Sequence, residues 1–435
     1  MRSVVRSLLV VALQFGFSPV GLAQGPARET LSLDQALAEA RANNPEIQAA
    51  RERGRAARVR IPQASALPDP TLGYTVMGPN FIETRTGPQD QVYEAEQMIP
   101  FPGKLWERRR MAAAEAKAAE AQAKAAERDV LLKVAETCAD LYAAEASLRA
   151  VEEVRQLLRS FENIAQARYA SQGGSQADVA KAQAESSEAL RKLFLLRQQR
   201  EAQAAALNAL LNRDPQAPPV DEVALPDQPV LSLNLSELLA FARRHRPELE
   251  EASSIVARDS HASALAKFGY LPDVSVGFQY VQIGGGMTSD PLDGRDAWMV
   301  PIKVTIPLWQ NRLVSEVREA KRNLAATQAQ LKQAENMTEA EVREAYARFM
   351  AARHVAALAE HALIPEAQLA ARSAQAAYEA GETTALNLID SQRLYLNAKI
   401  SYYEAVAETV KSFAALERAV GLDLTNVPGR TGGAQ

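Results

Sequence analysis

The strongest constraint on this chain is a pattern that occurs twice: two short strand-like runs followed by a very long helix-like stretch. In the second copy, apolar residues alternate with other residues over 274–280 and 298–306. In the first copy, the corresponding runs cover 72–76 and 92–99. Alternation with a period of two predicts strands with one apolar and one polar face. The alanine-rich stretches that follow predict long helices, because alanine is the best helix former.

Other short motifs return in the same order, which indicates a tandem duplication. Asn44-Pro45-Glu46 matches Arg246-Pro247-Glu248, and Leu67-Pro68-Asp69 matches Leu271-Pro272-Asp273. Chance similarity between alanine-rich helices would not place proline and aspartate in register, so we interpret the chain as two repeats. The predicted domains are a signal peptide (1–23), a first repeat of helix, two strands and long helical hairpin (24–230), a second repeat with the same elements (231–424) and a flexible C-terminal tail (425–435).

The N-terminus has the composition of a secretory signal peptide. Arg2 and Arg6 precede an apolar run over 8–13, and Gly21-Leu22-Ala23 provides small residues for cleavage after Ala23. A membrane anchor is the alternative, but the apolar run is well short of the ~20 residues that a spanning helix needs.

Helices of two lengths are predicted in each repeat. The long helix over 106–169 would measure roughly 95 Å, and its counterpart over 313–378 has a kink at Pro365. The returning helices, over 177–211 and 386–420, are about half as long. Two half-length helices stacked end to end would match one long helix, which predicts a wall one helix thick with water on both sides.

The opening helices, near 34–66 and 236–267, are also about half as long and are predicted to contain a break. Asp34 is a good N-cap for the first of them. Pro45 restarts that helix at a first turn, where the missing N–H of proline does no harm, and Pro247 has the same place in the second repeat.

The apolar faces of the strands leave two interpretations open. They could be half buried on a small soluble domain, or they could face lipid, with aromatic residues such as Tyr280 and Trp298 at the membrane interface. In the second interpretation a four-stranded sheet cannot close alone. Open edges are not tolerated in lipid, so several copies must share one barrel. The residues alone do not give the number of copies.

Composition and motifs speak against several functions. The net charge is −4 and no cluster of lysine and arginine is interleaved with aromatic residues, so nucleic acid is not an expected partner. No nucleophile–base pair has a supporting context, so we expect neither an enzyme nor a cofactor. His354 and His361 lie on one helix face without further ligands, so no metal site is predicted. The single cysteine, Cys138, is interpreted as a packing residue.

The chain resembles the TolC family of outer membrane efflux channels over nearly its whole mature length. The motifs that support this resemblance are specific as a set: Asn43-Asn44-Pro45-Glu46, His245-Arg246-Pro247-Glu248, Leu67-Pro68-Asp69-Pro70, Leu271-Pro272-Asp273, Gln97-Met98-Ile99-Pro100-Phe101-Pro102-Gly103-Lys104 and Tyr378-Glu379-Ala380-Gly381-Glu382-Thr383. Within this set, Ile99 to Lys104 is most similar to the CzcC-like heavy-metal branch.

The resemblance implies a mainly α fold with a transmembrane β part. Tandem-repeat α-helical hairpins would form an α-barrel tunnel in the periplasm, and four β-strands per chain would join a 12-stranded β-barrel in a homotrimer. A mixed equatorial region would form from 212–234 and the C-terminus. The implied function is the outer membrane channel of a tripartite efflux system, a passive gated conduit. Its implied partners are outer membrane lipid, a periplasmic adaptor (membrane fusion) protein and an inner-membrane pump of the resistance-nodulation-division type.

The resemblance also places a gate at the periplasmic tips of the helical hairpins, residues 169–178 and 378–390. Tyr378 and Asp178 match a closing hydrogen bond between neighbouring hairpins. Thr383 stands where a closing arginine can occur, so that salt bridge is not expected here.

Two further tip residues match a pair of acidic positions around the constriction. They are Asn387 and Asp390, and the neutral Asn387 argues against a double acidic ring. Three copies of Asp390 would still repel one another and attract cations. The sequence equally allows Asp390 to be a solvated residue on a helix face.

A soluble periplasmic coiled-coil scaffold or adaptor is the alternative function. In that case the strands would form a small β-domain. The faces over 274–280 and 298–306 are too continuously apolar for water, so such a domain would have to bury them. Burial or exposure of this face discriminates between the two functions.

Overall fold

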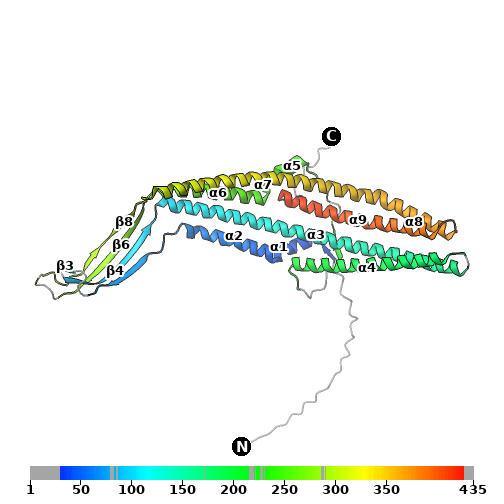
Figure 1. Cartoon of the computed structure of the whole chain (residues 1–435), viewed down its shortest axis with the longest axis horizontal. Helices are drawn as coiled ribbons and strands as arrows, with labels where there is room; N and C mark the ends of the chain where they lie inside the picture. Colours follow the sequence, from blue (N-terminus) through cyan, green and yellow to red (C-terminus); the bar gives the residue numbers. More distant parts are fainter. Residues whose placement is uncertain are drawn as a thin grey trace, which may run out of the picture.

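The molecule is long and narrow, with strands at one end and helical hairpins at the other (Figure 1). The computed structural model describes residues 30–78, 83–84, 87–171, 173–214, 220, 222–225, 229, 231–285, 289 and 291–425. The predicted signal peptide over 1–23 lies outside the described residues, and so does the predicted C-terminal tail beyond Thr425.

Two long helical stretches run along the molecule (Figure 1). The first is α3 (Pro102–Ala170), whose 69 residues measure roughly 100 Å. The second consists of α7 (Gln310–Leu358), a π-helical turn η1 (Ala359–Leu363) and α8 (Ile364–Glu379). Within the described ranges, no helix combines the length and the apolar character needed to cross a membrane.

The π turn stands directly before Pro365, where the sequence predicts a kink. Proline has no N–H to donate to the residue four positions back, so a regular α-helical ladder is interrupted there. The N–H of Ile364 instead donates to the carbonyl of Ala359, five residues back. The interruption is thus absorbed within one turn, and the helical stretch continues to the tip.

Half-length helices fill the layers beside the two long stretches. The helices α2 (Pro45–Ala64) and α4 (Gln176–Leu210) both pack along α3. The helices α6 (Pro247–Phe268) and α9 (Ala385–Val420) pack between α3 and the second long stretch. The layers therefore follow the order α2/α4, α3, α6/α9 and α7/α8 (Figure 1), which confirms the predicted end-to-end stacking.

Two short helices, α1 (Leu33–Asn43) and α5 (Leu235–His245), precede α2 and α6. The predicted break between α1 and α2 is confirmed, because Asn44 ends α1 and its side chain caps α2. The side-chain amide of Asn44 also donates to the carbonyl of Leu210 at 2.8 Å. This bond ties the break to the end of α4.

The prediction that Asp34 caps the first helix is wrong. The hydroxyl of Ser32 accepts from the N–H of Gln35, and the side chain of Gln35 accepts from the N–H of Ser32. This reciprocal pair is a capping box, and it satisfies two backbone donors where an aspartate cap would satisfy one. Asp34 consequently lies in the first turn, where its charge still favours the helix dipole.

The strands form an antiparallel sheet with the order β2-β4-β6-β7, in which β8 also pairs with β6 and β3 with β4. They are β2 (Thr71–Val76), β3 (Glu83–Thr84), β4 (Gly87–Ile99), β6 (Asp273–Ile283), β7 (Ala297–Met299) and β8 (Ile302–Thr305). The predicted fourth strand is divided at Pro301, since proline cannot donate to the ladder. The carbonyl of Pro301 still accepts from the N–H of Gly277 at 2.8 Å, so β7 and β8 both follow β6.

One face of this sheet is apolar and exposed. An aromatic row crosses it in register: Tyr74, Tyr93, Tyr280 and Trp298. Trp298 is 69% exposed. The other face is polar, and there the ammonium of Lys303 lies 2.6 Å from the carboxylate of Glu96. A small soluble domain would have to bury the apolar face, and this protomer does not.

A small parallel sheet lies near the middle of the molecule, where β1 (Thr30–Ser32) pairs with β5 (Glu222–Ala224). The strand β5 belongs to the segment 212–234, for which the sequence predicts an equatorial region. Apolar side chains from α1, α3, α4 and α9 are buried beside it, among them Cys138. Burial raises the pKa of the Cys138 thiol to about 12, so this cysteine is an unreactive packing residue.

Candidate functional site

Two hairpin tips lie together at the end of the molecule farthest from the strands (Figure 1). One tip joins α3 to α4, where Ser175 provides a capping box. The other joins α8 to α9 through Gly381, whose φ of 81° suits a residue without a side chain. Thr384 then caps α9. Because each turn satisfies its own backbone groups, the position of one tip relative to the other depends on side-chain contacts.

Tyr378, the predicted gate tyrosine, is buried between the two tips. It is 3% exposed, and the ring of Phe161 meets its ring edge-on at a centroid distance of 5.0 Å. Burial raises the pKa of the Tyr378 phenol; the charge of Arg168 opposes this shift, and the charge of Asp178 adds to it. The phenol therefore stays protonated at neutral pH, and the residue acts as a packing wedge between α3 and α9.

Arg168, in the last turn of α3, holds the two tips together, a role that was not predicted from the sequence. Its guanidinium donates to the carbonyl of Tyr378 at 2.7 Å and to the carbonyl of Gly173 at 3.3 Å. The same group lies 4.9 Å from the centroid of the Tyr378 ring, a cation–π contact. One side chain thus joins the end of α8 to the turn after α3.

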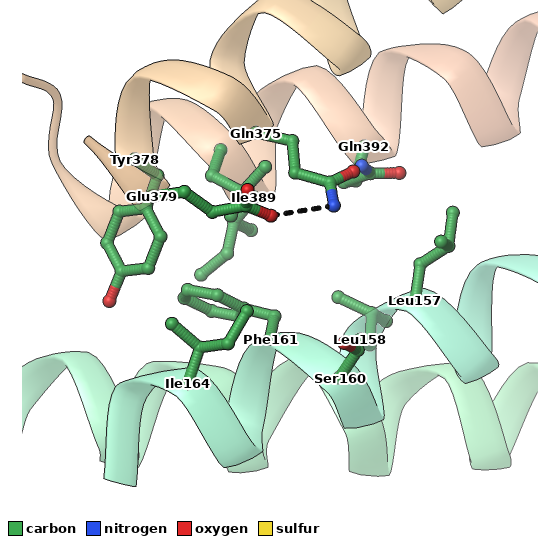
Figure 2. Close-up of a pocket in the computed structure, with 11 residues that line it drawn as sticks. Leu157, Leu158, Ser160, Phe161, Ile164, Gln375, Tyr378, Glu379, Ile389 and Gln392 are labelled. Carbon is green, nitrogen blue, oxygen red and sulfur yellow. Dashed lines mark hydrogen bonds between the residues drawn. The ribbon is translucent and has the colours of Figure 1, made fainter. Parts of the chain in front are cut away.

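A small cavity of about 20 Å³ lies in the seam between α3 and the pair α8/α9 (Figure 2). Phe161 and Ile164 line it from α3, and Gln375 and Glu379 line it from α8, where the Gln375 amide donates to the Glu379 carboxylate at 3.0 Å. Gln392 also lines it, and its buried side-chain oxygen has no hydrogen-bond partner among the described residues. The seam therefore holds a buried polar atom without a hydrogen bond, which is uncommon in a permanent core.

Asp178 lies in the other tip, where it belongs to the capping box of α4. Its N–H donates to the Ser175 hydroxyl at 3.2 Å, and its carboxylate accepts from the Ser175 N–H at 3.4 Å. Tyr378 and Asp178 lie near enough for the charge of Asp178 to act on the phenol, yet they share no hydrogen bond within the described part of one protomer. The predicted closing bond between neighbouring hairpins stays a prediction.

The remaining predicted gate residues lie in the turn before α9, at Thr383, and on the first two turns of α9, at Asn387 and Asp390. The side-chain amide of Asn387 donates to the hydroxyl of Thr383 at 2.9 Å. Asp390 is exposed, and its carboxylate lies 3.8 Å from the guanidinium of Arg393. Thr383 and Asn387 are thus brought together, whereas Asp390 points away from the Tyr378 seam toward solvent and Arg393.

A second contact between the hairpins was not predicted from the sequence. The Nε of Arg393, on α9, donates to the carboxylate of Glu185, on α4, at 3.0 Å, and a terminal nitrogen of the same guanidinium contacts the other carboxylate oxygen. This fork-like pairing raises the pKa of the Arg393 guanidinium. Since Arg393 also neighbours Asp390, the charge of Asp390 is partly compensated within the protomer.

The tip is built from packing, capping and ion-pair contacts. In the described portion of the chain, no group of three or more histidine, cysteine, aspartate or glutamate residues is placed to hold a metal ion. At the tip the two hairpins are joined by the Tyr378 wedge, the Arg168 clamp and the Glu185–Arg393 pair, and further along the seam α3, α4, α8 and α9 bury apolar side chains against one another. All of these contacts would have to change for the hairpins to separate along their length.

Comparison with known protein families gives one match along most of the chain. A model of the outer membrane efflux protein family matches residues 36–213 and 238–422. No curated protein matches the sequence.

Several solved structures share the fold at low sequence identity. The outer-membrane channel OprN is 19% identical with a TM-score of 0.76, and 90% of each chain is covered. The outer membrane protein VceC from Vibrio cholerae is 21% identical with a TM-score of 0.75, covering 90% of this chain and 96% of VceC. The Campylobacter jejuni CmeC outer membrane channel is 17% identical with a TM-score of 0.76, covering 96% of this chain and 94% of CmeC. At these identities the likeness establishes the fold.

Proposed function

This chain belongs to the outer membrane efflux protein family, and from that premise we propose that three copies form one passive, gated conduit from the periplasm to the exterior. It is an outer membrane channel component of tripartite efflux systems, with its helical tunnel in the periplasm. Channels of this family are trimeric and act with adaptors and pumps. They are transport channels, so we assign no catalytic step.

The single observation that supports the conduit most directly is the exposed apolar face of the sheet. Trp298 and Ile302 are each 69% exposed and Leu72 is 83% exposed on this face. Exposing such a face to water costs free energy, and contact with lipid tails removes that cost. Among the described residues, the edge strands β2 and β7/β8 each pair on one side, so their other edges would be completed by neighbouring copies. Three copies would give the 12-stranded barrel that the resemblance implies.

We propose that the working partners are a periplasmic adaptor protein and an inner-membrane pump of the resistance-nodulation-division type. The support for them is the family, whose channels act in efflux systems with adaptors and pumps. A passive tunnel needs a partner that supplies energy. The hairpin tips, at the far end from the membrane, are the part of the molecule that would meet such a partner.

We propose that the cargo is a heavy-metal cation. The support is the stretch Ile99 to Lys104, which resembles the CzcC-like branch and which in this fold forms the junction of β4 and α3. A deletion strain should lose resistance to divalent metals, with drug and solvent resistance unchanged, and the gene returned on a plasmid should restore it. A deletion strain that became sensitive to drugs alone would contradict a heavy-metal cargo.

We propose that the tips form the gate and that Tyr378 with Asp178, Thr383 with Asn387, and Asp390 are its residues. In a trimer, three Asp390 side chains would repel one another and favour cations at the mouth. The opening element would be the α8/α9 hairpin, because its tip is joined to α3 through Arg168 and to α4 through Arg393.

The test of the conduit is reconstitution of the purified full chain in a planar bilayer. A trimer that inserts and conducts ions supports the proposal. A protein that remains in the soluble periplasmic fraction as a monomer contradicts it.

A further inference from the structure

The start of each long helical stretch presents the same pair of exposed side chains. Trp106 is 53% exposed on α3, and Trp309 is 77% exposed directly before α7. An exposed arginine follows each tryptophan three residues later, at Arg109 and at Arg312. Residues three and four apart share one helix face, so Arg109 and Arg110 lie on the face of Trp106. Trp309 stands directly before α7, and Arg312 lies in the first turn of that helix.

In the first copy the arrangement is reinforced by Arg110. Its guanidinium carbon lies 4.9 Å from the centroid of the Trp106 ring. We define these five residues as the collar: Trp106, Arg109, Arg110, Trp309 and Arg312.

The collar lies where the strands end and the helices begin (Figure 1). From Trp298 to Trp309 an extended chain spans at most roughly 36 Å, at ~3.3 Å per residue. Tilted by ~40°, as barrel strands are, it rises roughly 28 Å, close to the ~25 Å apolar band of outer membrane barrels. At the end of this path next to Trp309 the exposed side chains are apolar: Ile306 is 67% exposed and Leu308 is 73% exposed. Trp298 and the collar tryptophans therefore mark the two edges of one band.

The charges around the collar are predominantly positive. Glu107 is buried, and its carboxylate lies 2.8 Å from Nδ1 of His261 and 3.9 Å from the guanidinium of Arg110. Glu316 pairs with Arg312 at 2.5 Å and is the acidic neighbour on α7. Arg109 has no ion pair among the described residues. Guanidinium groups one turn beyond an interfacial tryptophan stand at the level of lipid headgroups.

We propose that the collar binds the anionic headgroups of phospholipids in the inner leaflet of the outer membrane. A guanidinium group offers two parallel N–H donors to a phosphate, and the neighbouring indole is amphipathic and favours the interface. A second copy of the chain is the competing occupant. If the collars of two copies met, their positive charges would repel each other. The negatively charged phosphodiester of a phospholipid is complementary to each collar.

The inference rests on the membrane location of the strands and is independent of the gate. The chain has three tryptophans, which are Trp106, Trp298 and Trp309. Three variants that each keep one tryptophan, with phenylalanine at the other two positions, can be reconstituted as trimers in vesicles whose acyl chains carry bromine near the headgroup. Quenching of all three fluorescence signals is expected. Quenching of Trp298 without Trp106 and Trp309 would overturn the collar and leave the membrane location intact, and no quenching at all would overturn both.

A second measurement tests the charge. The variant Arg109→Gln/Arg110→Gln/Arg312→Gln should lower the preference of the trimer for phosphatidylglycerol over phosphatidylcholine at least about fivefold, as counted by native mass spectrometry. The matched control removes three exposed arginines that lie outside the collar, further along α4 and α7: Arg191→Gln, Arg343→Gln and Arg348→Gln. Like Arg312, each of them pairs with a glutamate of its own helix.

The control should keep the preference. An equal loss in both variants would show a nonspecific effect of charge and overturn the inference. So would an unchanged preference together with a weakened trimer, because the collar would then be a contact between copies.

Discussion

Lys104 and Asp273 join the first repeat to the second at the base of the sheet, with the ammonium nitrogen 2.8 Å from the carboxylate oxygen. Lys104 also donates to the carbonyl of Leu271 at 3.0 Å, and Asp273 accepts from the N–H of Phe101 at 2.8 Å. The two side chains are only 12% and 17% exposed. Two of the motifs that define the resemblance therefore meet in space, and they hold the start of β6 against the start of α3.

We expect Lys104→Met to destabilise the protein by about 3 kcal/mol, because it leaves a mostly buried carboxylate without its cation. Denaturant unfolding of the purified protein measures this. Lys124→Met is the control, since Lys124 and Glu250 form an exposed pair with side chains 58% and 49% exposed, worth about 0.5 kcal/mol. Equal losses in the two variants would mean that the Lys104–Asp273 pair has no special structural role.

Arg168→Gln is expected to loosen the closed tip. It removes two charged hydrogen bonds and the cation–π contact to Tyr378, and a loss of about 1.4 kcal/mol shifts the open–closed equilibrium about tenfold. Open probability in single-channel recordings reports the change. Arg372→Gln, an exposed position on α8, provides the comparison and should leave the open probability as it was. A tip that stays closed in Arg168→Gln would contradict the clamp.

Tyr378→Phe combined with Asp178→Ala tests the predicted bond between neighbouring hairpins. Phenylalanine keeps the packing against Phe161, and Asp178 contributes only a helix cap within the protomer. Loss of that cap costs about 1 kcal/mol of stability. Because the bond needs both side chains, each single variant would already break it, so Tyr378→Phe, Asp178→Ala and the double variant should show the same increase in conductance over the parent. Conductance of Tyr378→Phe equal to that of the parent would exclude the bond.

Glu417 gives a pH dependence of stability. Burial raises the pKa of its carboxyl from 4.5 to about 7, and a hydrogen bond from the N–H of Leu424 opposes the shift. The folded chain therefore holds this proton more tightly than the unfolded chain does. Stability from this group is present below pH 4.5 and is lost as the pH rises to about 7.

The variant Glu417→Gln keeps the acceptor for Leu424 and removes the titration. At pH 8 it should be more stable than the parent by about 2 kcal/mol, after allowance for screening by solvent. At pH 4 the two should be alike. Denaturant curves at both pH values check this, with Glu344→Gln on the exposed face of α7 as the control. A constant difference across the pH range would show that Glu417 does not titrate as described.

Local patterns in the sequence predicted most of the fold. The ends of α4 and α9 lie within one residue of their predicted positions, because turns and caps are encoded by neighbouring residues. Pro301 divides a strand whose alternation alone appeared continuous. The small sheet of β1 and β5 was not predicted, since its strands are three residues each and pair across the whole first hairpin.

The candidate site was harder to predict than the fold. Tyr378 and Asp178 were found by resemblance, but Arg168 contacts a carbonyl 210 residues away. No pattern within one helix predicts such a contact, because the contact depends on how the packed helical layers position the two hairpins. The same holds for Glu185 and Arg393, which are 208 residues apart.

The π turn before Pro365 holds one residue more than the α-helical turn that it replaces. An inserted residue in an ordinary helix would rotate everything after it by about 100°, and the wedge at Tyr378 would then face away from α3. The bulge takes up that surplus locally. The π turn therefore lets this helix accommodate a change of length while Tyr378, at the distant tip, keeps its orientation toward α3.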